Sequence, residues 1–78
     1  MQALRTWYRE ASREIWHNPN QVKLHFGKAS IIGNNRVVFN ICDNKYRLIV
    51  EIDYPKSWIF IRFIGTHSSY DTINPHTI

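Results

Sequence analysis

The chain has 78 residues, a formal net charge of +4 and a single cysteine. This length suits one domain, residues 1–78, with a thin core and a short flexible tail at about 74–78. The excess of basic residues favours an anionic partner, either nucleic acid or an acidic protein. A lone cysteine excludes an internal disulfide. The apolar run "WIFI" at 58–61 is too short to span a bilayer, so we expect a cytoplasmic protein.

The first third of the chain has the apolar spacing of helices. Five apolar residues recur at helical intervals and predict an amphipathic helix over residues 2–16. These residues are Leu4, Trp7, Tyr8, Ala11 and Ile15. Asn18 followed by Pro19 is a helix-start signal, and Gln21 can complete a capping box, so a short helix is predicted over about 19–26. Residues 27–35, rich in Gly and Asn, are predicted to form a loop.

From Arg36 onward the apolar period changes to two, as in β-strands. Three segments rich in β-branched and aromatic residues predict strands at 36–42, 45–54 and 57–65. Asp43-Asn44 and Pro55-Lys56 supply the turns between them. The predicted fold is α+β, with the helices packed on one face of a three-stranded antiparallel meander.

The predicted turns fix which residues share a face of the sheet. Phe39 would lie opposite Leu48, and Leu48 opposite Phe63, on an apolar face covered by the helices. The other face would collect the polar side chains of the strands, interspersed with Val38, Ile49, Phe60 and Ile64. These polar residues are Arg36, Asn40, Lys45, Arg47, Glu51 and Arg62.

Two interpretations of this second face stay open. It could be an ordinary solvated face whose charges pair locally, as Arg36 and Glu51 would do. Alternatively, it could be a basic surface that grips a phosphate backbone, for which arginine is well suited.

The segment "RFIGTHSSYD" at 62–71 adds chemically active groups. The predicted register puts Arg47 beside Ile64, so this segment begins near Lys45 and Arg47. His67 and Tyr70 are three residues apart and would share one side of a helical turn. Metal-independent RNA cleavage needs proton transfer and stabilisation of charge on phosphorus, which histidine or tyrosine and arginine can supply. The structural alternative makes His67 a cap or a core hydrogen-bonding group, and Tyr70 a buried ring.

Other kinds of site find little support in the sequence. The four histidines do not form a ligand-spaced pair with each other or with Cys42, so we expect neither a metal nor a cofactor. Cys42 itself is predicted to be an inert strand residue.

Two long stretches, "NNRVVFNICDNKYRLIVEIDY" and "IFIRFIGTHSSYDTI", closely resemble the HigB family of type II toxins in the RelE/ParE superfamily. The preceding "WYREASREIWHNPNQVKLHFGKASIIG" resembles that family more loosely. The resemblance implies a metal-independent mRNA interferase that cuts mRNA on the ribosome and inhibits translation. It also implies neutralisation by a HigA-like helix-turn-helix antitoxin. Family members usually carry a further N-terminal strand that is absent here, which implies an apolar sheet edge.

The resemblance also suggests roles for individual residues. Arg47 would stabilise transition-state charge, His67 or Tyr70 would transfer protons, and Asp71 would orient a neighbouring group. RNA contacts would come from the remaining polar residues of the second face, with Arg62 contacting RNA or antitoxin. These are Arg36, Asn40, Lys45 and Arg62.

Two other functions remain possible at this point. The chain could be a non-catalytic module that binds RNA or an antitoxin, or a gyrase-directed toxin of the ParE kind. The combination of Arg47, His67 and Tyr70 favours RNA cleavage over both.

Overall fold

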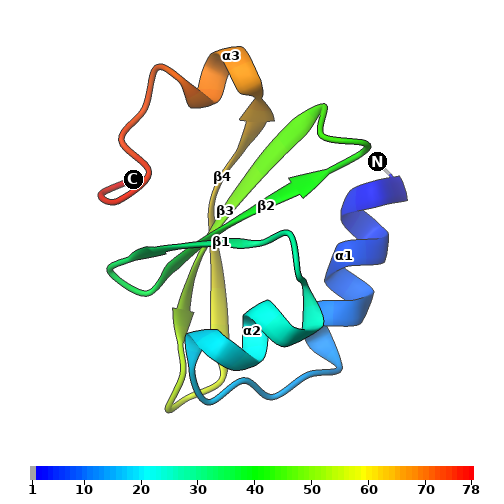
Figure 1. Ribbon diagram of the computed structural model, residues 1–78, viewed down its shortest axis with the longest axis vertical. Helices are drawn as coiled ribbons and strands as arrows, with labels where there is room; N and C mark the ends of the chain where they lie inside the picture. The colour runs from blue at the N-terminus through cyan, green and yellow to red at the C-terminus, as the bar shows by residue number, and fades with distance from the viewer. Residues whose placement is uncertain (1) are drawn as a thin grey trace.

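The computed structural model describes residues 2–78, in which three helices accompany a four-stranded antiparallel sheet (Figure 1). The strands lie in the sheet in chain order, so neighbouring strands are joined by hairpins. The elements in order are α1 (Gln2–Ser12), α2 (Pro19–His25), β1 (Ser30–Gly33), β2 (Arg36–Ile41), β3 (Tyr46–Asp53), β4 (Trp58–Thr66) and α3 (His67–Tyr70).

The start of α2 follows its predicted cap, whereas α1 is shorter than predicted. The Asn18 side chain accepts a hydrogen bond from the Gln21 amide at 3.0 Å, with Pro19 in the first helical turn. α1 ends at Ser12, and the chain that follows buries Trp16 in the core. Ile15 therefore lies outside the helix and is 66% exposed.

The prediction of a loop over residues 27–35 is wrong, and the sheet has four strands instead of three. Ser30 and Ile31 pair with Val38 and Val37 across a tight hairpin. Asn34 and Asn35 both have positive φ, which matches the backbone twist of a two-residue hairpin turn. The turn residues were visible in the sequence, but the strand before them is too short to show an alternating pattern.

The predicted register of β2 and β3 is confirmed. Phe39 lies opposite Leu48, Asn40 opposite Arg47, and Arg36 opposite Glu51. Asp43 and Asn44 have the positive φ expected of their turn. Cys42 also has positive φ and belongs to this turn, so its placement in a strand was wrong.

The predicted register of β3 and β4 is confirmed at Val50 and Ile52, which lie opposite Ile61 and Ile59, and it is wrong between Tyr46 and Ile49. The pairing shifts between Ile49 and Val50, so that Arg62 is an extra residue in β4. Ile49 then lies opposite Phe63, and Leu48 opposite Ile64. Because one extra residue exchanges the two faces, Phe63 moves away from the core face and Ile64 moves onto it. Arg47 consequently lies beside Gly65 instead of Ile64.

The core lies between the helices and one face of the sheet. It is formed by Trp7, Ala11, Trp16, Val22, Ala29, Val37, Phe39, Ile41, Leu48, Val50 and Ile52. We call the opposite side, which carries Arg36, Asn40, Arg47 and Glu51, the outer face.

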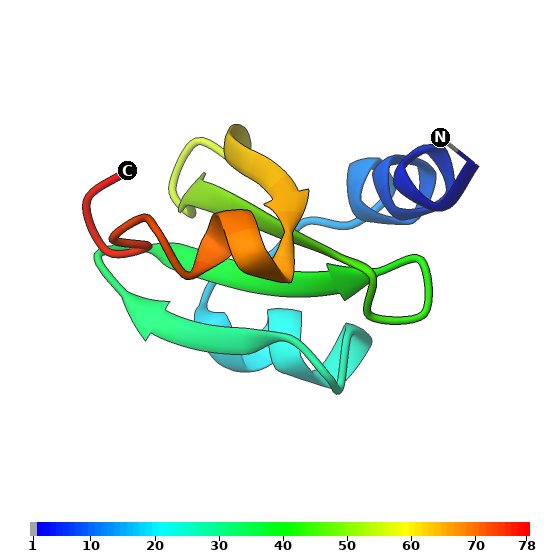
Figure 2. The ribbon, with the colours of Figure 1, turned by 90° about the horizontal axis from the view of Figure 1, so that it is seen from above.

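The outer face is less exposed than predicted. Val38 and Ile49 belong to this face, yet they are only 1% and 0% exposed. The segment after β4 turns back over the outer face, first as α3 and then as a tail that reaches the β1–β2 hairpin (Figure 2). The C-terminal segment therefore supplies a partial third layer that the sequence did not predict.

An apolar sheet edge is present at β4, which pairs only with β3. Trp58 and Ile61 on this strand are 54% and 55% exposed. Together with Trp7 and Tyr8 of α1 they line a groove of about 750 Å³. Within residues 2–78, no helix is long and apolar enough to cross a membrane.

Candidate nucleic-acid interface

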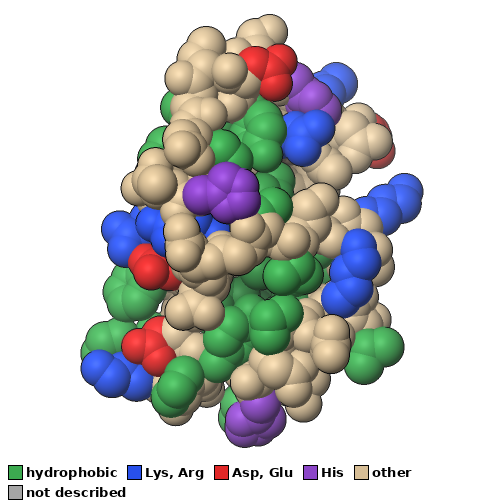
Figure 3. All heavy atoms as spheres, turned by 60° about the vertical axis from the view of Figure 1, so that its left-hand side comes forward, with side chains coloured by type: hydrophobic (Ala, Val, Ile, Leu, Met, Phe, Trp, Pro, Cys, Tyr) green, Lys and Arg blue, Asp and Glu red, His purple; other side chains and the backbone are tan. Residues whose placement is uncertain are grey.

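The basic side chains of the outer face form separate groups instead of one continuous patch. Figure 3 shows Lys and Arg side chains divided by hydrophobic and other atoms, with some of them next to acidic side chains. Two groups matter for function. The open end comprises Asn40, Lys45, Arg47 and Tyr70, and the closed end comprises Asn34, Arg36, Glu51, Arg62 and Ile78.

The open end is built from β3 and the turn that follows β4. The Arg47 guanidinium carbon lies 4.6 Å from the centre of the Tyr70 ring, a cation–π distance. Thr66 pairs with Tyr46 at the end of the sheet and caps α3, since its Oγ1 accepts a hydrogen bond from the Ser69 amide at 3.2 Å. The helical turn predicted for His67 and Tyr70 therefore exists, and it returns Tyr70 to Arg47.

Gly65 permits this close return of the chain. A Cβ atom at Gly65 would lie 2.7 Å from Cζ of Phe63 and 3.3 Å from Cβ of Ser69. The first distance is too short for a real side chain, so a larger residue would displace the Phe63 ring or α3. The sequence analysis missed this role because both close contacts depend on the bulge at Arg62 and on the fold of α3.

Polar groups at the open end are left without partners inside the protein. Nε of Arg47 and Oδ1 of Asn40 are buried and make no hydrogen bond with residues 2–78, although the two residues are cross-strand neighbours. Arg47 also forms no ion pair with an acidic side chain in the described part of the chain. A buried donor without an acceptor costs about 1–3 kcal/mol of stability. A ligand oxygen that accepts a hydrogen bond from Arg47 would remove this cost.

The other residues predicted for this end lie around the pair in more exposed positions. Lys45 and His67 are exposed, in the β2–β3 turn and at the start of α3. Asp71 caps the C-terminal end of α3 through its amide, which donates to the His67 carbonyl at 3.0 Å. Its carboxylate makes no hydrogen bond within residues 2–78, so no neighbour that it orients is evident there. Residues 2–78 also hold no group of three His, Cys, Asp or Glu side chains suited to a metal ion.

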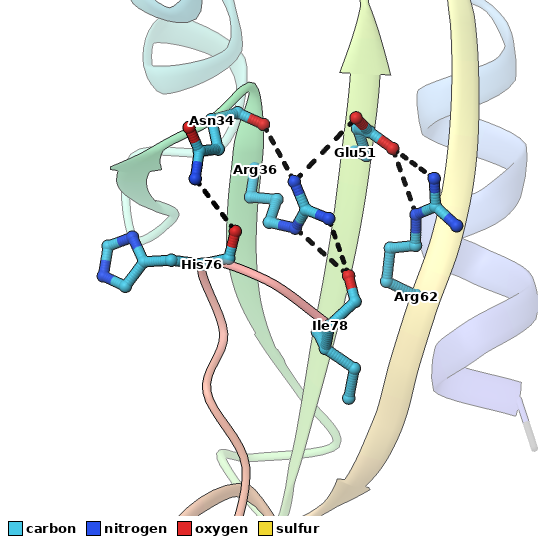
Figure 4. Close-up of polar contacts among 6 residues, drawn as sticks. All are labelled: Asn34, Arg36, Glu51, Arg62, His76 and Ile78. Atoms are coloured by element: carbon cyan, nitrogen blue, oxygen red, sulfur yellow. Dashed lines mark hydrogen bonds and ion pairs between the residues drawn. The ribbon is translucent and has the colours of Figure 1, made fainter.

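The two arginines of the closed end share one carboxylate, that of Glu51 (Figure 4). Arg62 donates to a Glu51 carboxylate oxygen through Nε at 3.1 Å and also through Nη2. Arg36 lies 3.8 Å from the other oxygen of Glu51. The hydrogen bond from Arg62 and the charges of both arginines hold the pKa of Glu51 below its ordinary value of 4.5, against a smaller opposing effect of desolvation.

Arg36 is further bound by main-chain oxygens of two segments. Its Nε and Nη2 donate to the Ile78 main-chain oxygen at 3.2 and 2.7 Å, and its Nη1 donates to the Asn34 carbonyl oxygen at 3.1 Å. Its side chain is only 11% exposed. The local pairing of Arg36 and Glu51 weighed from the sequence is therefore present, and both cations of this end already have protein partners.

The family model of the HigB toxin, described as the RelE-like toxic component of a toxin–antitoxin system, matches residues 1–73. The chain therefore belongs to the HigB toxin family. Among curated proteins, none matches this chain.

As a toxin of a toxin–antitoxin system, the protein has an antitoxin as its partner.

Proposed function

We propose that the protein is an mRNA interferase, a metal-independent endoribonuclease that cuts ribosome-bound mRNA in the cytoplasm and is neutralised by a HigA-like antitoxin. The observation that carries this proposal is the open end, where Arg47 stacks on Tyr70 and has no acidic partner within residues 2–78. An arginine held in this way can receive a phosphate without first breaking an ion pair.

The proposed reaction uses the RNA 2′-hydroxyl as nucleophile. The hydroxyl loses its proton, its oxygen attacks the adjacent phosphorus, and the 5′-oxygen of the next nucleotide leaves with a proton. Arg47 would stabilise the charge that develops on the phosphate oxygens. Tyr70 or His67 would handle the protons, while Lys45 and Asn40 would hold the neighbouring nucleotides.

The remaining predicted residues take smaller parts in this proposal. Asp71 lies next to Tyr70 in sequence and would act only by orienting a group that moves when RNA binds. Arg62 is occupied by Glu51, so its contact with RNA or antitoxin would be peripheral. Arg36 would contribute only when its contacts with the tail are broken.

Induced expression in bacteria tests the proposal. Growth should stop, primer extension should map new breaks in mRNA, and coexpressed antitoxin should relieve both effects. The Arg47→Ala variant should no longer produce the mRNA breaks. The matched control, Arg9→Ala on α1, should still produce them. Growth arrest with intact mRNA and accumulating DNA breaks would instead indicate a gyrase-directed toxin. Binding of RNA without breaks or arrest would indicate a non-catalytic module.

A further inference from the structure

Residues 74–78 form a compact turn of their own at the closed end of the outer face. The Asn74 carbonyl oxygen accepts hydrogen bonds from the amides of Thr77 and Ile78 at 3.2 and 3.1 Å. The Asn74 side chain accepts a third bond, from the His76 amide at 3.0 Å. The family match ends at residue 73, so this turn lies outside the part of the chain that matches the family.

Three hydrogen bonds fasten the turn to the β1–β2 hairpin, as Figure 4 shows. Asn34 donates through Nδ2 to the His76 carbonyl oxygen at 3.0 Å, and Arg36 donates through Nε and Nη2 to the Ile78 main-chain oxygen. Both acceptor atoms, on His76 and Ile78, are main-chain oxygens of the tail. The position of the tail backbone therefore decides whether these bonds form, and the Asn74 side chain helps to fix that backbone through its bond to the His76 amide.

The Ile78 oxygen occupies the position that an anion would take on Arg36. Two guanidinium N–H groups converge on this one oxygen, which is how arginine also binds a phosphate oxygen. Nη1 is bound to the Asn34 carbonyl and faces Glu51, so only one N–H of Nη2 is left, and the Nε–Nη2 edge that binds a phosphate is taken by the tail. An RNA phosphate and the tail must therefore compete for Arg36.

We propose that residues 74–78 are a strap that holds Arg36 away from an RNA phosphate, and that displacing the strap adds one phosphate contact to the interface. This inference rests on the proposed function for its ligand, RNA. The partly buried side chains of Ile73, Pro75 and Ile78 favour the closed position of the strap in the free protein. RNA bound first at Arg47 would raise the local concentration of phosphate near Arg36 and so favour opening.

RNA affinity of a chain that ends at Ile73 tests the strap directly. The probe is a short single-stranded RNA with 2′-O-methyl groups throughout, which cannot be cleaved by attack of the 2′-oxygen. Removing the strap should raise affinity about fivefold and steepen the slope of log affinity against log salt by about 0.7, the value for one added phosphate contact on a single strand. Arg36→Gln in the shortened chain should abolish both gains. Equal affinity and slope with and without the strap would overturn the inference while leaving the proposed function intact.

A second pair of variants keeps the chain at full length. Asn34→Gly removes the bond to His76 and tolerates the positive φ of that position, and Asn35→Gly is the matched control in the same turn. The Asn34→Gly variant should gain about twofold in RNA affinity, and the control should not change. If the shortened chain fails to fold by circular dichroism, this pair decides the question, and equal affinities overturn the strap.

A measurement without RNA separates the strap from the proposed function. The Arg36 Nε–H signal in a nitrogen–proton NMR spectrum is followed during titration with inorganic phosphate. It should shift at lower phosphate concentration in the shortened chain, and in Asn34→Gly, than in the full chain. This result would support the strap even if no RNA cleavage is found. Identical titrations in all variants would overturn it.

Discussion

The two ends of the outer face carry the same kinds of side chain in opposite electrostatic states. At the closed end Arg36 and Arg62 share Glu51, and Nε and Nη2 of Arg36 donate to the tail. At the open end Arg47 rests on an aromatic ring and has no acidic partner within residues 2–78. Arginines at the closed end mainly fix the structure, whereas the arginine at the open end is available to a ligand.

This difference has a simple physical origin. An arginine that already shares a carboxylate must give up that attraction before it binds phosphate, so much of the energy of the new contact is lost. An arginine stacked on a ring keeps its edge donors free while the ring limits its motion. The contrast between the ends therefore predicts a ranking of mutational effects.

The largest effect is expected at Arg47. Arg47→Ala should lower the rate of mRNA cleavage by about 100-fold, and Arg47→Lys should recover little, since lysine lacks the planar fork. Arg36→Gln should lower the rate by about threefold or less, since this side chain is already engaged. Primer-extension time courses after induction measure both rates. Comparable losses at the two arginines would show that the ends do not differ in function.

Removing the Tyr70 hydroxyl should lower the rate of mRNA cleavage less than the loss of Arg47 does, but still by a large factor. Tyr70→Phe keeps the ring beneath Arg47, so a loss of about 10-fold to 100-fold would reflect proton transfer alone. Tyr70→Ala should lose more, because the support of Arg47 disappears as well. Tyr8→Phe, at an exposed tyrosine of α1, is the control and should keep full activity. A fully active Tyr70→Phe together with an inactive His67→Ala would assign the proton transfer to His67.

Substitution of Gly65 should lower the stability of the fold, and should lower activity only as a consequence. Because its added Cβ would meet the Phe63 ring at 2.7 Å, Gly65→Ala should cost about 1–3 kcal/mol of unfolding free energy. Gly27→Ala is the matched control, since nothing lies within 4 Å of its added Cβ. Urea unfolding measures both variants. Equal stability of the two would mean that the Phe63 ring moves aside at no cost.

The smallest effect concerns the pH dependence of the closed end. The pKa of Glu51 is lower in the folded protein than its ordinary value of 4.5. Its ion pairs therefore stabilise the fold fully at pH values above 4.5. That stabilisation is lost as the pH falls through the lowered pKa. Glu51→Gln should therefore unfold at a lower urea concentration at pH 6, and should lose less stability than the native chain on acidification to pH 3.

Glu10→Gln on α1 is the control, because Glu10 forms no ion pair within the part of the chain that the structure describes. It should leave the urea midpoint at pH 6 unchanged. An acid dependence of Glu51→Gln identical to that of the native chain would mean that Glu51 does not hold this end together.

The β2–β3 hairpin was the most predictable part of the molecule. Its alternating pattern and its Asp43-Asn44 turn are both local, and together they set Asn40 opposite Arg47 and Arg36 opposite Glu51. The prediction that Arg47 and Tyr70 share one end of the sheet is confirmed by their 4.6 Å separation. Their roles in catalysis stay predictions.

Other features could not be predicted because their causes lie elsewhere in the chain. β1 is stable as a strand only because β2 offers it a free edge. The bulge at Arg62 exchanges Phe63 and Ile64 between the faces without leaving any mark in the sequence pattern. The burial of Val38 and Ile49 depends on a C-terminal segment that begins at His67, far along the chain from both residues.

The sequence by itself determined the α+β class, the second helix cap, the central hairpin and the identity of the polar residues on the outer face. These follow from periodicity and turn chemistry, which act over a few residues. Only the tertiary structure decided which cations are neutralised and which are free. Charge pairing depends on distances of a few ångströms between segments, and here the bulge and the returning C-terminal chain set those distances.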